Sequence, residues 1–253
     1  MTMIRNVFES VTGAGAMINW ISVAREDLPI YEDWYNFQHL PERVSTPGFL
    51  RARRFVAADQ AQLGEAAMVD YLTLYETVDV HVLASPEYLR RLDNPTDLTL
   101  EVVPLFTEFR RAACHITVAR GDGSSGRVVV VEAQSGNDLE TLRDALAGSV
   151  FQELINEHRV VAASLYEPDI TVSDAKNSTA EGRSSDQQQA LSAVVLIELH
   201  SGVDADALIA DLAHRATRAG ARFDQSRPAR IFELIYELRS ATTSYPSAEA
   251  PCE

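Results

Sequence analysis

Lysine is almost absent from this 253-residue chain, because its 22 basic residues comprise 21 arginines and Lys176 alone. We attribute this bias to a GC-rich genome. Cysteine is nearly as scarce, and Cys114 with Cys252 cannot make a disulfide framework, so we expect a reducing, cytoplasmic setting. No run of roughly 18 apolar residues exists, which argues against a transmembrane helix. We also expect no signal peptide, because residues 1–6 lack an apolar core.

Charge and missing motifs narrow the class of protein further. A net charge of −15 argues against nucleic acid or an anionic membrane surface as a partner. It does not exclude a small molecule as the ligand, even an anionic one, because a few arginines can dominate one pocket. The chain has no glycine-rich dinucleotide motif, no phosphate-binding Gly-Lys-Ser/Thr loop and no Gly-x-Ser-x-Gly nucleophile elbow. His81, His200 and His214 show no metal-ligand spacing with each other or with carboxylates, so we expect no metal site.

Hydrophobic periodicity predicts the same element order twice. Strands are expected at residues 17–23, 49–57, 68–76 and 112–119, with helical segments in between, the β-α-β-β-α-β order of ferredoxin-like folds. After the flexible Gly/Ser segment 121–126, strands are expected at 128–133, 160–166, 191–199 and 230–238, with helices at 138–154, broken at Gly148, and at 204–219. We therefore predict an α+β fold with domains at 1–120 and 127–240 and a flexible tail at 241–253.

Residues 173–189 are predicted to form an exposed, mobile loop between the second and third strands of the second domain. The segment is polar, holds few apolar residues and ends in three glutamines. Such a segment buries too little apolar surface to offset the entropy lost on ordering.

The most informative stretch runs from Ile30 to Phe49. Ile30, Trp34 and Phe37 have the spacing of an amphipathic helix. That helix is expected to end near Pro41, because a proline disfavours the α conformation in the residue before it. The chain then turns at Pro47-Gly48 and enters a strand. One His, one Glu and one Arg (His39, Glu42 and Arg43) are thus expected where a helix ends beside a sheet.

The pattern Trp34-Tyr35, then His39-Leu40-Pro41-Glu42-Arg43, then Pro47-Gly48-Phe49, resembles the dimeric α/β-barrel superfamily, and within it the EthD-like members and a related, largely uncharacterised group. The resemblance continues at 71–76, 82–89 and 94–96, so it spans about residues 15–119. In that superfamily two ferredoxin-like sheets face each other across a dimer. The resemblance therefore implies that two tandem halves of this chain form one pseudo-dimeric α/β barrel, with a working first half and a scaffold second half. The tandem chain could in addition form a homodimer.

His39 is the candidate catalytic residue, since a neutral imidazole can remove a proton beside a carbonyl. The alternative is a histidine that caps a helix C-terminus. We expect it to face a partly apolar cavity between the first sheet and its helices. Burial would lower its pKa and the Glu42 carboxylate would raise it, so the sequence leaves the direction open.

Candidate substrate-binding residues surround His39 in the sequence or share its predicted sheet. Glu42 and Arg43 could orient His39 or hold a carboxylate, or form a surface ion pair. On the strand at 49–57, Arg51 and Arg53 share one face and need acidic partners, for which Glu76 and Asp70 are candidates, whereas Arg54 faces the other way. Aromatic residues could line the pocket or belong to the core. The full set is Trp34, Tyr35, Glu42, Arg43, Arg54, Tyr75 and Tyr88.

The resemblance implies a small-molecule enzyme that needs no cofactor. Its reaction would be proton transfer, isomerisation, cyclisation, lyase chemistry or a simple oxygenation of an aromatic or carbonyl compound. One alternative is a non-catalytic binding or accessory protein of a degradative pathway. Another is a haem protein, since some branches of the superfamily bind haem through a histidine.

Overall fold

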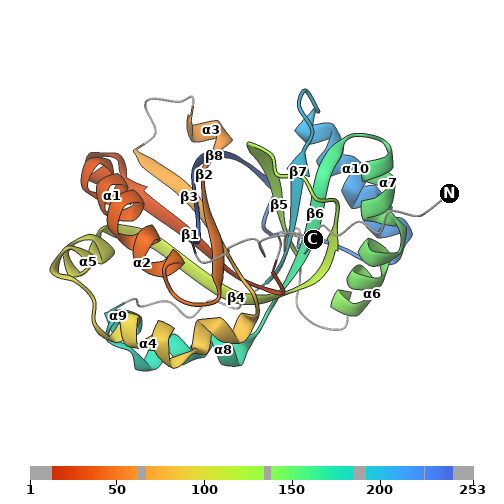
Figure 1. Ribbon diagram of the computed structural model, residues 1–253. Helices are drawn as coiled ribbons and strands as arrows, with labels where there is room; N and C mark the ends of the chain where they lie inside the picture. The colour runs from red at the N-terminus through yellow and green to blue at the C-terminus, as the bar shows by residue number, and fades with distance from the viewer. Residues whose placement is uncertain (1–12, 62–66, 134–137, 185–191, 225, 242–253) are drawn as a thin grey trace, which may run out of the picture.

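The computed structural model describes residues 13–61, 67–133, 138–184, 192–224 and 226–241. Its centre is a closed antiparallel barrel with strand order β1-β3-β2-β8-β5-β7-β6-β4 (Figure 1). Closure pairs each of the eight described strands on both sides. The strands are β1 (Gly15–Ala24), β2 (Phe49–Ala57), β3 (Met68–Thr77), β4 (Phe106–Arg120), β5 (Arg127–Ala133), β6 (Val160–Pro168), β7 (Ala193–Leu199) and β8 (Arg230–Arg239).

Each half of the chain contributes four neighbouring strands to the barrel. The first half lies in the order β4-β1-β3-β2 and the second in the order β8-β5-β7-β6. The two sets meet where β2 pairs with β8 and where β4 pairs with β6. The predicted α+β barrel is confirmed at this level, and its eight strands come from one chain.

Helices cover the outside of the barrel in two groups (Figure 1). Beside the first half lie η1 (Arg25–Asp27), α1 (Leu28–Trp34), η2 (Tyr35–His39), α2 (Leu40–Val44), η3 (Val80–Ala84), α4 (Pro86–Asp93), α5 (Asp97–Val102) and η4 (Val103–Leu105), while the short α3 (Ala58–Ala61) follows β2. Beside the second half lie α6 (Asp138–Ala145), η5 (Leu146–Val150), α7 (Phe151–Asn156) and α10 (Ala205–Arg218). No helix of the described residues is both long and apolar enough to cross a membrane.

The hydrophobic core has three parts because alternate residues of each strand face opposite sides of the sheet. Ala52 and Val56 of β2 pack against the first group of helices. Phe55 of the same strand points into the barrel, where residues of both halves pack together. A third cluster joins the second half of the barrel to α6, α7 and α10. The barrel interior therefore holds the two halves together.

Charged side chains also lie inside the barrel, as the alternation on β2 predicts. Arg51 pairs with Glu76, and Arg53 pairs with Glu198 at 2.5 Å and with Glu76 at 3.6 Å. All four are at most 5% exposed. The predicted partner Glu76 is confirmed, and Glu198 from the second half completes the network, which satisfies the need of buried charges for counterions.

Two predicted helix breaks are wrong, because π-helical turns carry the helix onward in both places. The first helix continues through Pro41 to Val44, with η2 preceding the proline and the Leu40 N–H bonded to the Tyr35 carbonyl five residues back. The wider turn shifts the hydrogen-bond register, so the proline falls in the first turn of α2, where its missing N–H costs little. At Gly148 the turn η5 links α6 to α7 in the same way. Likewise, the helical segment expected before the strand at 112–119 ends at Leu105, and β4 starts at Phe106, six residues before the expected strand.

The exposed loop predicted at 173–189 is wrong for residues 173–184, which form helices; residues 185–189 lie outside the described residues. The segment from Asp169 to Ser184, here called the strap, contains α8 (Ile170–Ala175), η6 (Lys176–Ser178) and α9 (Ala180–Ser184). Asp169 caps α8 by accepting from the Val172 N–H. Although it follows β6 of the second half, the strap lies beside α4 of the first (Figure 1).

Candidate active site

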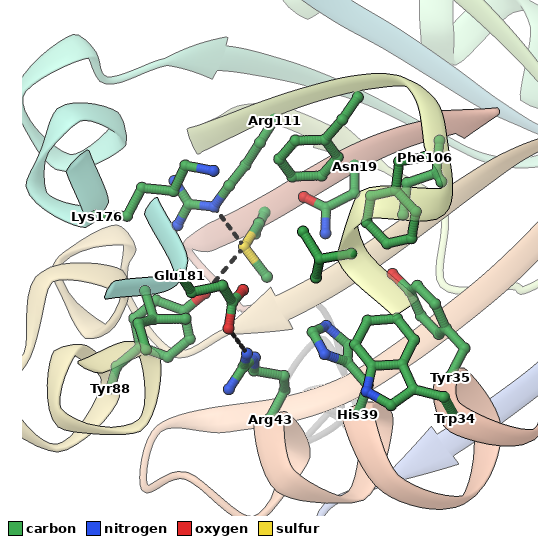
Figure 2. A pocket seen from close by; sticks show the side chains of 15 residues that line it. Asn19, Trp34, Tyr35, His39, Arg43, Tyr88, Phe106, Arg111, Lys176 and Glu181 are labelled. Atoms are coloured by element: carbon green, nitrogen blue, oxygen red, sulfur yellow. Dashed lines mark hydrogen bonds and ion pairs between the residues drawn. The ribbon is translucent and has the colours of Figure 1, made fainter. Parts of the chain in front are cut away.

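A small cavity lies between the outer face of β1 and β4, the helices of the first half and the strap (Figure 2). Measured as the space open to the centre of a water molecule, its volume is about 30 Å³. That is room for about two waters. Its lining is aromatic and apolar, with a few polar groups: Met17, Asn19, Ile21, Trp34, Tyr35, His39, Arg43, Tyr88, Leu92, Val103, Phe106, Phe109, Arg111, Lys176 and Glu181.

The alternation of side chains along β1 and β4 determines which residues form the floor of the cavity. Asn19 of β1 pairs in register with Arg111 of β4, and Ile21 pairs with Phe109. These residues point to the same side because their positions differ by two along each strand. Both polar members lack a complete set of partners, since the buried Asn19 Oδ1 and Arg111 Nη2 atoms have no hydrogen bond within the described part of the chain.

His39 forms part of the wall opposite Arg111 (Figure 2). It ends the π-helical turn η2, is 6% exposed, and has a buried Nδ1 without a hydrogen-bond partner among the described residues. Its ring lies 4.4 Å from the Trp34 ring and 5.0 Å from the Tyr35 ring, centroid to centroid. The predicted position of His39 at a partly apolar cavity therefore matches the geometry.

Burial sets the protonation state of His39. Desolvation lowers its pKa well below the usual 6.5, and the positive charges of Arg43 and Arg54 lower it further. Glu42 is not among the causes of the shift. The imidazole is therefore neutral near pH 7, which is the form that accepts a proton.

Hydrogen bonds behind the wall fix the aromatic side chains. The Trp34 indole N–H donates to Thr99 Oγ1 at 3.1 Å, and the Tyr75 hydroxyl donates to the Tyr35 hydroxyl at 3.2 Å. Burial raises the pKa of Tyr75 well above its usual value, with Tyr35 adding to the effect, so that phenol stays protonated. These contacts fix the orientation of Trp34 and Tyr35 beside His39.

Arg43 joins the helix of His39 to the strap. Its guanidinium is 2.5 Å from the Glu181 carboxylate and lies over the Tyr88 ring at 5.9 Å. Arg43 is 2% exposed, and the Glu181 side chain is 21% exposed. The strap is held at other points too, since the Ala180 N–H donates to Asp93 at 2.9 Å and the Ser173 hydroxyl accepts from the Ala113 N–H at 3.0 Å.

Lys176 enters the cavity from the strap (Figure 2). Its ammonium lies 4.6 Å from the centre of the Phe109 ring. Burial lowers the pKa of Lys176 to about 7, and the positive charge of Arg111 adds to this effect while Glu181 opposes it. The only lysine of the chain is therefore a titratable group near neutral pH.

Of the residues predicted from sequence, Trp34, Tyr35, His39, Arg43 and Tyr88 meet at the cavity. Tyr75 lies behind Tyr35. Glu42 instead borders a separate shallow depression with Arg90, Arg91 and Asn94.

Arg54 is not part of the cavity lining either. It pairs with Glu32 at 2.7 Å and with the Asn36 side chain at 2.5 Å. Its guanidinium also lies 4.4 to 5.2 Å from the ring centres of three tyrosines, which are Tyr31, Tyr35 and Tyr71. Roles in substrate binding for these three outlying residues, Glu42, Arg54 and Tyr75, stay predictions.

Four polar cavity residues were missed from the sequence: Asn19, Arg111, Lys176 and Glu181. Asn19 and Arg111 interrupt strands whose neighbouring same-face positions are apolar or aromatic, which is a usable signal. Lys176 stands out as the single lysine, and the Asp169 cap of α8 indicates a helix start. No local pattern connects Glu181 with Arg43, 138 residues away.

Comparison with known proteins supports the fold and leaves the family open. No family model and no curated protein matches the chain. Among solved structures, an anthrone oxidase-like protein matches with a TM-score of 0.60 and 10% identity, covering 92% of this chain and 96% of that one. A protein of Fusobacterium nucleatum subsp. nucleatum, provisionally named a monooxygenase, matches with a TM-score of 0.52 and 9% identity, covering 90% and 95%. A Lactobacillus acidophilus protein, also provisionally named a monooxygenase, matches with a TM-score of 0.52 and 10% identity. The match covers 90% of this chain and 97% of that one. Identities this low show a shared fold alone, and the EthD-like resemblance is not confirmed.

Proposed function

We propose that this chain is a small-molecule enzyme of the oxygenase type, in which His39 removes a proton from an aromatic ketone or a related carbonyl compound. The observation that carries the proposal is the state of His39. It is a buried, neutral imidazole at a cavity wall, and its Nδ1 lacks a partner among the described residues. A buried polar atom without a partner is costly unless a ligand or water satisfies it.

The chemistry follows from a neutral base next to aromatic walls. A substrate whose methylene group is made acidic by a conjugated carbonyl loses one methylene proton to His39 and becomes an enolate. Molecular oxygen, the second substrate, then adds at that carbon, and the resulting peroxide takes up the proton to give a hydroperoxide. Loss of water converts the carbon to a ketone, so one methylene group and one O2 yield one carbonyl group and one water. No cofactor is required in this scheme, because the enolate supplies the electrons.

Anthrone is the natural first test substrate. It has a methylene group between two aromatic rings, conjugated with a ketone, and one structural neighbour is named anthrone oxidase-like. The aromatic walls formed by Trp34, Phe106 and Phe109 suit a flat ring system.

The cavity must widen for such a substrate to enter. A volume of about 30 Å³ holds water and no aromatic ring. The strap closes one side, and its attachments through Glu181 and Ala180 are polar contacts near the surface. We therefore place the entrance at α9, with release of the Arg43–Glu181 pair as the opening step.

The architecture fits one site per chain. The matching strand orders β4-β1-β3-β2 and β8-β5-β7-β6 support two tandem ferredoxin-like halves. In this interpretation the first half carries His39 and the second supplies the strap. A homodimer of the tandem chain stays a prediction, checked by light scattering of the purified protein.

The two alternative functions, a haem protein and a non-catalytic binding protein, would each use His39 differently. A haem protein would bind iron through an imidazole nitrogen of His39, and the purified protein would then show a Soret absorption band. A binding protein would use the same cavity without turnover, and its affinity would survive loss of the base.

The test is oxygen uptake with anthrone in air-saturated buffer, with the quinone product followed by its absorbance. Wild type should consume one O2 per product formed, and His39→Gln should lower the rate by about 10²- to 10⁴-fold. His200→Gln, which changes an exposed histidine of the second half, is the matched control and should leave the rate unchanged. Equal rates for wild type and His39→Gln would remove His39 from the chemistry.

A further inference from the structure

The cavity gathers positive charge in a chain whose net charge is −15. Three basic side chains line it, Arg43, Arg111 and Lys176, against one carboxylate, Glu181. That carboxylate is engaged with Arg43. The cavity lining therefore carries more basic than acidic side chains.

Arg111 has weak partners for a partly buried guanidinium. Its Nε donates to the thioether sulfur of Met17 at 3.0 Å, and its Nη1 donates to the Ser173 carbonyl at 3.3 Å. Its Nη2 is buried with no hydrogen bond among the described residues. Thioether sulfur is a poor acceptor, so the guanidinium keeps most of its capacity for an anionic oxygen.

Lys176 brings a second cation to the same side. It is positioned by the strap, over the Phe109 ring. Burial and the charge of Arg111 are the two largest causes of its lowered pKa. Arg111 and Lys176 together make this part of the cavity lining favourable for a negatively charged group.

We propose that Arg111 and Lys176 form an anion site that binds the ionised oxygen of an aromatic phenol or enol, across the cavity from His39. This rests on the proposed function, in which removal of a proton at His39 transfers negative charge to the carbonyl oxygen of the substrate. Donors placed where the charge develops stabilise the enolate, as in an oxyanion hole. The substrate class is therefore an aromatic compound whose oxygen can carry a full negative charge.

The arrangement makes ligand affinity depend on pH. The charged groups that act on Lys176 are Arg111 on β4, Arg43 on α2 and Glu181 on α9. A bound phenolate adds a negative charge and raises the pKa of Lys176 from about 7. In wild type, phenolate affinity should thus fall as pH rises above 7, because Lys176 loses its charge. In Lys176→Arg the affinity should fall less, because the guanidinium stays charged.

The probe is 4-nitrophenol, because its anion absorbs visible light and its neutral form does not. The titration is run below the pKa of the free phenol, where little anion exists without protein. Wild type should increase the anion absorbance to saturation. Arg111→Met and Lys176→Met should each weaken binding roughly tenfold to a hundredfold, the effect of removing one charge-assisted hydrogen bond.

Controls separate a local effect from misfolding. Arg218→Met removes an exposed positive charge on α10 and should bind as wild type does. Arg111→Lys and Lys176→Arg keep the charge and should recover most of the affinity. Thermal unfolding of each variant shows whether it is folded. If a methionine variant does not fold, Arg111→Lys and Lys176→Arg still test whether affinity depends on these two positions.

The outcomes separate this site from the proposed reaction. His39→Gln should keep the phenolate signal while losing oxygen uptake. A signal that depends on Arg111 and Lys176 supports the anion site even if anthrone is not oxidised. No anion signal with wild type, or equal affinity in wild type and both methionine variants, would overturn the anion site and leave the proposed role of His39 to its own test.

Discussion

Arg43 of α2 pairs with Glu181 of α9 at 2.5 Å, and so joins the helix that carries His39 to a segment contributed by the other half of the chain. The pair borders the cavity, with Arg43 2% exposed and the Glu181 side chain 21% exposed. The candidate site is therefore complete only when the strap is in place. Stability of the strap and access to the cavity should be coupled.

Glu181→Gln tests this coupling. It leaves the buried Arg43 without its counterion, so the free energy of unfolding should fall by about 1–3 kcal/mol in urea titrations. Protection of the strap against hydrogen exchange should fall as well. Glu101→Gln, which changes an exposed carboxylate on α5, should have no such effect. The double variant Arg43→Met/Glu181→Gln should recover part of the loss, because the buried guanidinium is removed together with its counterion. If Glu181→Gln unfolds as Glu101→Gln does, the pair does not hold the strap.

The lowered pKa of His39 predicts how stability changes with pH. The folded state binds this proton less readily than the unfolded state, whose histidine titrates near 6.5. Stability from this group is complete above pH 6.5 and is lost as pH falls from there toward the depressed folded value. The difference in unfolding free energy between wild type and His39→Gln should therefore shrink below pH 6.5. A difference that stays constant with pH would mean that His39 is not buried in its neutral form.

Seven of the eight strands were predicted from sequence to within two residues at each end, whereas β4 begins at Phe106, six residues before the predicted start at 112. The bounds of β2 agree at both ends and those of β3 and β5 to one residue, because a period of two in hydrophobicity depends only on neighbouring residues. The helix of His39 was placed correctly but ended too early. A proline usually disfavours a continuing helix, and the turn from Tyr35 to His39 removes that conflict by a change of hydrogen-bond register that local pattern does not show.

The strap could not be predicted in the same way. Its composition is polar, and composition alone indicated disorder. Its order comes from distant partners: Val172 packs in the core of the first half, Ala180 bonds to Asp93, and Glu181 bonds to Arg43. Sequence therefore identified the half of the site that lies on the motif around His39 and missed the half built by long-range contacts.

Arg54 should act on stability and not on phenolate binding. It is fully buried among three tyrosines and paired with Glu32, whose side chain is 33% exposed. Arg54→Met should lower the free energy of unfolding by about 2–4 kcal/mol through loss of the ion pair and of the cation–π contacts. 4-Nitrophenol affinity at low temperature should stay near wild type. A large loss of affinity in a folded Arg54→Met protein would instead support the substrate-binding role expected from sequence.

Lys176 should react as an amine of low pKa. Since its pKa is about 7, a neutral acylating reagent should modify it increasingly as pH rises through 7, well below the range of an ordinary lysine. Peptide mass spectrometry can follow this site without overlap, because the chain has no other lysine. Bound 4-nitrophenolate should protect it. Labelling that begins only near the usual lysine pKa, with or without the phenolate, would contradict the burial of the amine beside Arg111.

The most direct test of the central claim, that His39 removes a proton from carbon, is hydrogen exchange of the substrate without oxygen. Anthrone is incubated with the protein in deuterated water under anaerobic conditions, and loss of the methylene proton signal is followed by NMR. Wild type should speed exchange above the buffer rate, and His39→Gln should lose about 10²- to 10⁴-fold of that acceleration while His200→Gln keeps it. Equal acceleration by wild type and a folded His39→Gln protein would contradict the account.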